Sequence, residues 1–109
     1  MIKMIEQQFE SPNLADISLT QLLKSLSDPT RLKIVGTLLR AKKEVSCAQF
    51  ENLGKKSNLS QHYRNLRLAG LVSIRRAGRH SYLALRKTAL DERFPDLIET
   101  IVNNSEDKC

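Results

Sequence analysis

Long apolar runs, cysteine and tryptophan are scarce in this sequence of 109 residues. No stretch approaches the roughly 18 consecutive apolar residues of a membrane helix, and the first residues lack the apolar core of a signal peptide. Two cysteines, Cys47 and Cys109, are too few and too far apart to indicate a disulfide-stapled secreted scaffold, and they form neither a CxxC nor a CxC pair of the kind that binds metal. Aromatic residues make up only 5%, which disfavours stacking platforms for single-stranded nucleic acid. We therefore expect a cytoplasmic protein that does not act at a membrane.

What is present fits one folded module. Hydrophobic residues make up 40% and charged residues 28%, near the average for folded soluble domains. No internal repeat or Pro/Gly/Ser-rich linker divides the chain, and its length suits one hydrophobic core. We expect a single domain over residues 1–109, with residues 1–10 and 104–109 loosely held.

The basic residues are concentrated in the middle of the chain. Residues 1–30 carry two Lys or Arg against four Asp or Glu, residues 31–87 carry fourteen against two, and residues 88–109 carry two against six. The net charges of the three segments are therefore −2, +12 and −4. Like charges repel during folding, so a block of this kind favours a partner made of phosphates.

Apolar spacings of three and four predict two helices in the first part of the chain. The first helix lies within residues 14–26, where four leucines form one stripe. Asp28 can cap the next helix, and Pro29 suits its first position, where the missing N–H is not needed. This second helix should run over residues 29–41.

The middle of the chain predicts two more helices and a hairpin. Ser46 can cap a short helix over residues 47–53, which ends at Gly54. Ser57 can cap a longer helix that ends before Gly70, a usual residue after a helix C-terminus. The period then changes to two over residues 72–85, with a turn at 77–80, which indicates a β-hairpin. A last helix should lie around residues 96–103.

Two short helices followed by an arginine-rich hairpin predict a mostly α-helical winged helix-turn-helix. The longer helix should face inward with Leu59, Tyr63 and Leu66, which turns its polar side chains outward. The side chains expected to contact base edges of double-stranded DNA are Asn58, Ser60, Gln61, His62, Arg64 and Asn65. Those expected to contact phosphates are Lys55, Lys56, Ser57, Arg67, Arg75, Arg76 and Arg79.

Two motifs carry a resemblance to a known family. Residues 26–34 read LSDPTRLKI and residues 60–72 read SQHYRNLRLAGLV. Over roughly residues 14 to 102 the chain resembles the ArsR/SmtB family of small bacterial winged-helix repressors. The resemblance implies a homodimer formed by the first and last helices, which binds an inverted repeat and is released by an inducer. Nothing in the sequence identifies that inducer.

The chain departs from the metal-responding members of this family. The segment that holds paired thiolates in those members reads EVSCA over residues 44–48, so the CxC pair is absent. A second family site uses histidines of the terminal helices, but His62 and His80 both lie in the DNA-reading half. We assign no metal and no cofactor. The segment 53–60 is shorter than is common in the family. The helix that carries the base-contacting residues can therefore lie at a different angle than in other members.

Cys47 has three interpretations. A buried core residue is the first, because free cysteine is often buried. The second is a thiol switch, in which a helix dipole lowers the pKa of Cys47 and Cys109 reaches it. This pairing resembles the paired cysteines of sulfide- or oxidant-sensing family members. The third is a metal site in which the two thiols join carboxylates such as Asp91, Glu92 or Asp96.

No arrangement of residues predicts catalysis. Ser60 and His62 stand two apart on one helix and point to different faces, which does not suit nucleophilic chemistry. We therefore expect no enzyme activity. The alternative to a DNA-binding regulator is a winged-helix module that binds proteins and has lost DNA binding.

Overall fold

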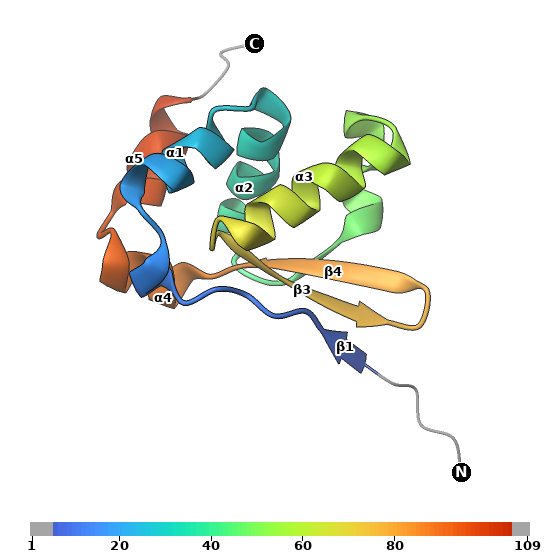
Figure 1. Ribbon diagram of the computed structural model, residues 1–109. Helices are drawn as coiled ribbons and strands as arrows, with labels where there is room; N and C mark the ends of the chain where they lie inside the picture. Colours follow the sequence, from blue (N-terminus) through green and yellow to red (C-terminus); the bar gives the residue numbers. More distant parts are fainter. Residues whose placement is uncertain (1–5, 106–109) are drawn as a thin grey trace.

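Five α-helices, two short 3-10 helices and a four-stranded antiparallel sheet make up the computed structural model, which describes residues 6–105 (Figure 1). The winged helix-turn-helix fold predicted from the sequence is confirmed. The long helix α3 crosses the front of the molecule above the β3–β4 hairpin, while α1, α4 and α5 lie at the opposite end from the hairpin tip.

The first two helices begin at side-chain caps. Helix α1 spans Leu19–Leu26, and the Ser18 hydroxyl accepts a hydrogen bond from the backbone N–H of Gln21. Helix α2 spans Pro29–Ala41, and the carboxylate of its N-cap residue Asp28 accepts from the backbone N–H of Arg31. The predicted limits of α2 are confirmed. The first helix begins later than predicted, because Leu14–Asp16 forms a separate 3-10 turn, η1.

The helix-turn-helix consists of the 3-10 helix η2, Cys47–Leu53, and α3, Lys56–Leu68, which are joined at Gly54. Ser46 caps η2 as predicted. The prediction that Ser57 caps α3 is wrong, because the N-cap position falls on Lys55 and Ser57 lies in the first turn. After α3, Gly70 adopts φ +82°, and a Cβ there would lie 2.6 Å from Leu14 Cδ2. A side chain at this position would therefore strain the backbone and collide with η1.

The hairpin is formed by β3, Val72–Ala77, and β4, His80–Leu85, around a two-residue turn in which Gly78 has φ +62°. Two strands that local patterns did not indicate flank it. Strand β1, Glu6–Gln8, pairs with β3, and β2, Val45–Ser46, pairs with β4, so the order is β1-β3-β4-β2. Strand β1 thus lies within residues 1–10, which no sequence pattern placed in a sheet.

Two helices close the described chain. Helix α4, Lys87–Arg93, was not predicted, whereas α5, Leu97–Asn104, lies close to the expected last helix. Asn104 ends α5 and Ser105 occupies its C-cap position, so the segment predicted to be loosely held begins at the end of this helix. The rest of the predicted flexible ends, residues 1–5 and 106–109, lies outside the described residues, and so does Cys109.

A single hydrophobic cluster connects these elements. Among its fully buried members are Leu22, Ile34, Leu38, Phe50, Leu66, Leu83, Leu90 and Ile98. They come from α1, α2, η2, α3, β4, α4 and α5. The cluster therefore seats α3 on the rest of the fold and leaves its other face at the surface. No helix within residues 6–105 has the length and apolar character needed to cross a membrane.

Candidate nucleic-acid interface

Helix α3 packs its apolar side chains into the core, so its polar side chains face outward. Leu59 and Leu66 are buried at 3% and 0% exposure, and they lie seven residues apart, about two helical turns. This anchoring leaves five of the predicted base-contacting residues exposed: Asn58, Ser60, Gln61, Arg64 and Asn65. Amide, hydroxyl and guanidinium groups of this kind can read base edges in a major groove.

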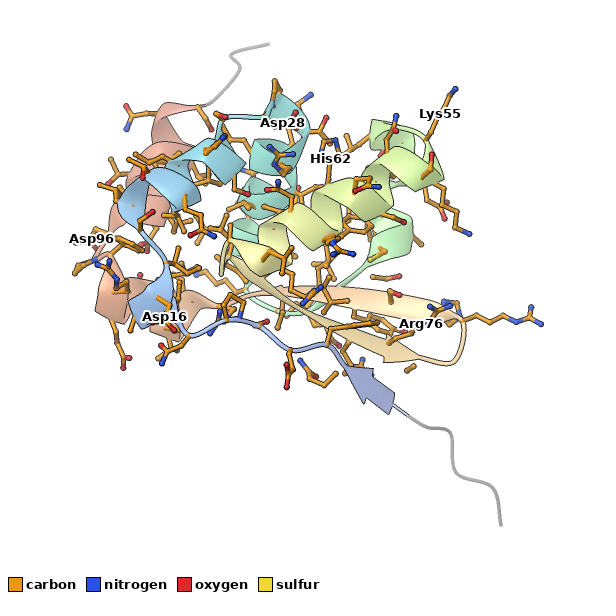
Figure 2. All side chains as sticks on the ribbon, viewed as in Figure 1. Asp16, Asp28, Lys55, His62, Arg76 and Asp96 are labelled. Atoms are coloured by element: carbon orange, nitrogen blue, oxygen red, sulfur yellow. The ribbon has the colours of Figure 1, made fainter. Side chains whose placement is uncertain are left out.

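Exposed cations flank this face at two places. Lys55, Lys56 and Ser57 are exposed where α3 begins, and Arg76 and Arg79 are exposed on the hairpin. Figure 2 shows Lys55 and Arg76 toward the same end of the molecule, with their side chains pointing away from the ribbon. The positive end of the α3 dipole also points toward the lysines. Together these groups form a surface suited to phosphates on both sides of a polar helix.

Arg75 is engaged within the protein. Its Nε donates to Glu44 Oε2 at 2.9 Å and its Nη2 to Glu44 Oε1 at 2.7 Å, so the pair is bidentate. The hydrogen bonds from Arg75 hold the pKa of Glu44 below its ordinary value. The guanidinium also lies 4.5 Å from the centre of the Tyr82 ring. Arg75 therefore braces the sheet against the loop after α2, and the structure does not place it with the exposed cations.

Arg67 is also engaged, at the C-terminal end of α3. Its Nη1 donates to the backbone carbonyl of Glu10 at 2.6 Å, and its guanidinium lies 5.9 Å from the centre of the Phe9 ring. The backbone of Phe9 in turn donates to the carbonyl of Ile74 on β3. Arg67 thus ties α3 to the segment that follows β1.

Two of the predicted base-contacting residues are bonded to side chains of α2 and α1, although one of them, Asn65, is exposed. His62 is half-buried, and its Nδ1 lies 3.1 Å from Arg31 Nη1. Asn65 Oδ1 accepts a hydrogen bond from the Ser25 hydroxyl at 2.6 Å. Sequence reasoning assigned no role to Ser25, which lies outside both motifs, or to Arg31, which lies inside the motif at residues 26–34. It named Asp28 only as a helix cap, although its carboxylate also faces His62 at 3.9 Å.

Cys47 is half-buried at the start of η2, beneath α3. Burial raises the pKa of Cys47 to about 11, and a hydrogen bond with Tyr63 only partly offsets this. The same environment raises the pKa of Tyr63. The predicted lowering of the Cys47 pKa by a helix dipole is therefore wrong, because desolvation of the thiolate dominates. The suggested partner Cys109 lies outside the described residues.

The carboxylates suggested as metal ligands lie on and between the last two helices. Lys87 Nζ lies 2.5 Å from Asp91 Oδ2 and 3.2 Å from Glu99 Oε2, so Asp91 belongs to an ion-paired cluster. These contacts raise the pKa of Lys87. Glu92 and Asp96 are exposed. Across residues 6–105, His, Cys, Asp and Glu side chains form no group of three or more that could hold a metal ion.

Comparison with known proteins bears on the same region. Residues 26–75, from the end of α1 into β3, match a helix-turn-helix domain family. A protein of Bacillus subtilis (strain 168), named "uncharacterized HTH-type transcriptional regulator YceK", is 37% identical to this chain over 86 residues. The match covers 74% of this chain and 83% of the relative.

Proposed function

The chain belongs to the family of helix-turn-helix transcriptional regulators, and from this premise we propose that it is a homodimeric repressor that binds an inverted-repeat DNA operator. One observation carries the proposal. The core holds α3 so that a polar face stays exposed between the lysines at its start and the arginines of the hairpin. A surface of this kind suits a major groove and its two phosphate backbones.

In this proposal the exposed residues of α3 read the bases. Gln61 can pair with adenine and Arg64 with guanine through two hydrogen bonds each, and Asn58 and Ser60 contact neighbouring edges. The phosphate contacts come from the exposed flanks, namely Lys55, Lys56, Ser57, Arg76 and Arg79. Arg67, Arg75, His62 and Asn65 are given structural roles instead, because the protein itself engages them.

The proposed dimer uses α1 and α5, as the resemblance to the ArsR/SmtB family implies. Leu19 and Leu23 lie four residues apart on one face of α1 and are 45% and 40% exposed. Exposed leucines in such a pair favour burial against a second copy. On α5, Leu97 and Ile101 are half-buried, and both helices lie at the end opposite the hairpin tip (Figure 1). A two-fold axis there would place the two α3 helices in successive major grooves, about 34 Å apart.

A selection experiment tests this function. The protein is incubated with a pool of randomised duplexes, and the enriched sequence is used as operator against a random duplex. Arg64→Ala should lower the preference for the operator by about 1–3 kcal/mol, because a base contact is lost. Arg79→Ala is the matched control and should weaken binding to both duplexes alike.

Two results would contradict the proposal at different points. An unchanged operator preference in Arg64→Ala would exclude α3 Arg64 as a reader of bases. Absence of any retarded complex at low salt would exclude DNA binding altogether and favour the protein-interaction module. The signal that releases the repressor stays open between a small molecule and a thiol modification.

A further inference from the structure

Ser25 stands at the centre of a polar connection between three helices. It is the one buried polar side chain among residues 8–105, with 3% exposure. Its hydroxyl donates to Asn65 Oδ1 on α3 at 2.6 Å, and its backbone carbonyl accepts from Arg31 Nε on α2 at 2.7 Å. One residue of α1 is therefore joined both to the reading helix and to α2.

Arg31 continues this connection to His62. Arg31 Nη1 lies 3.1 Å from His62 Nδ1. A guanidinium can only donate, so the bond requires Nδ1 to be the acceptor and the imidazole proton to sit on Nε2. Asp28 Oδ2 accepts a hydrogen bond from the backbone N–H of Arg31 at 3.0 Å, and the same oxygen lies 3.9 Å from His62 Nδ1. Figure 2 shows Asp28 and His62 next to each other between α2 and α3.

The bonds among these residues form a closed ring, because both ends of the connection lie on α3. His62 and Asn65 are three residues apart and so lie on one face of α3. Arg31 meets the first, Ser25 meets the second, and Ser25 and Arg31 meet each other. A helix that is held at two points one turn apart can neither rotate about its own axis nor slide without breaking one of these bonds.

We propose that His62 and Asn65 are positioning residues, which set the rotation of α3 through Arg31 and Ser25 and thereby determine which base edges Gln61 and Arg64 reach. The proposal rests on the proposed function. Base readout needs side chains placed within about 0.5 Å and 10–20°. A small rotation of α3 would misplace both readers while the exposed cations still reach the phosphates. The loss should therefore appear in sequence preference and not in general DNA affinity.

The first test measures affinity for the selected operator and for a random duplex, well below the unfolding temperature. His62→Leu should lower the ratio of the two affinities about tenfold, as for a lost base contact, with the random-duplex affinity unchanged. His62→Asn should recover most of the ratio, because the amide oxygen can replace Nδ1 as acceptor. His80→Leu, at the other histidine and exposed on the hairpin, is the matched control and should change nothing.

Arg31 distinguishes positioning from direct contact. Arg31→Met should lower the ratio at least as much as His62→Leu, because it removes the donor to Ser25 as well as the donor to His62. The double variant should lose no more than Arg31→Met alone, since the bond between Arg31 and His62 is already broken. The proposal is overturned if Arg31→Met keeps the wild-type ratio, or if the two losses add. It is also overturned if every variant loses affinity for both duplexes in proportion to a loss of folded protein.

A second measurement does not depend on DNA. Nitrogen-15 NMR of the imidazole rings should show His62 with its proton on Nε2, and its Nδ1 signal should move in Arg31→Met while the His80 signals do not. A proton found on Nδ1, or an unmoved signal, overturns the proposal. If the wild-type protein prefers no duplex, the proposed function fails, whereas the NMR result still decides whether Arg31 holds His62.

Discussion

The two ends of the molecule use their charged residues differently. At the hairpin end, Lys55, Lys56, Arg76 and Arg79 stand exposed around α3. At the other end, Lys87 pairs with Asp91 and Glu99, and Arg93 donates to the backbone carbonyls of Leu14 and Ile17. Both ends contain basic residues. They differ in whether those residues already bond to acceptors within the protein. A cation is available to DNA only where the fold has not already used it.

Salt should affect the hairpin end most. If the dimer neutralises roughly six to ten phosphates, its affinity for a duplex should fall by about 10³ to 10⁵ between 50 and 200 mM salt, because condensed counterions are released on binding. Fluorescence anisotropy titrations at several salt concentrations measure the slope. A flat slope would show that the exposed cations do not meet phosphates.

The opposite end should respond to loss of its exposed leucines. Replacing Leu19 and Leu23 together by Ser should weaken dimerisation by about 3–6 kcal/mol, or more than about 100-fold, since a little under half of each side chain remains to be buried and a two-fold dimer contains each leucine twice. Sedimentation velocity measures the dimer dissociation constant. Leu68→Ser is the matched control, because Leu68 is 44% exposed at the end of α3 and should leave dimerisation unchanged. An unaffected double variant would place the dimer interface elsewhere.

The reactivity of the Cys47 thiol tests whether the hairpin end of the molecule contains a thiol switch. With a pKa of about 11, little thiolate forms at pH 7.5, and reactivity should rise as the pH approaches that value. The higher nucleophilicity of a basic thiolate offsets part of this loss, so alkylation should be about tenfold slower than in the unfolded chain. Mass spectrometry of iodoacetamide-treated Cys109→Ser protein, with and without urea, isolates Cys47. Faster reaction in the folded protein would support the thiol switch.

The smallest effect is expected at Glu44, which holds one cation of the hairpin end. Its pKa is lowered in the folded protein, so its stabilising effect is present at neutral pH and is lost as the pH falls through that lowered value. Because the pair is partly exposed, Glu44→Gln should reduce the free energy of unfolding by less than about 1 kcal/mol at pH 7, and by a smaller amount at pH 3. Urea unfolding at both pH values measures the difference. A deficit as large at pH 3 as at pH 7 would contradict the ion pair as its cause.

Local signals predicted much of the fold. Helix α2 was placed correctly because Asp28 and Pro29 act within one turn of chain, and the hairpin because its turn contains Gly78 at positive φ. The exposure of Asn58, Gln61 and Arg64 followed from the helical period once Leu59 and Leu66 were assigned to the core. Their contact with bases stays a prediction.

Other features had no local signal. Strand β1 is polar and short, and its pairing with β3 joins residues about seventy positions apart in the chain. Helix α4 buries only Leu90 and has no side-chain cap, so neither its period nor its start was visible. For Arg67, Arg75, His62 and Asn65, residue type indicated DNA contact, but residue type does not tell which acceptor or donor the fold brings near.

The placement of α2 and of the β3–β4 hairpin, the polar stripe of α3 and the basic middle segment depend on neighbours within a few positions, and the sequence alone determines them. Only the tertiary structure decided which basic and polar side chains bond within the protein and which stay exposed around α3. The reason is physical: a hydrogen bond needs its partner within about 3 Å, and these partners lie 31 to 57 residues away along the chain.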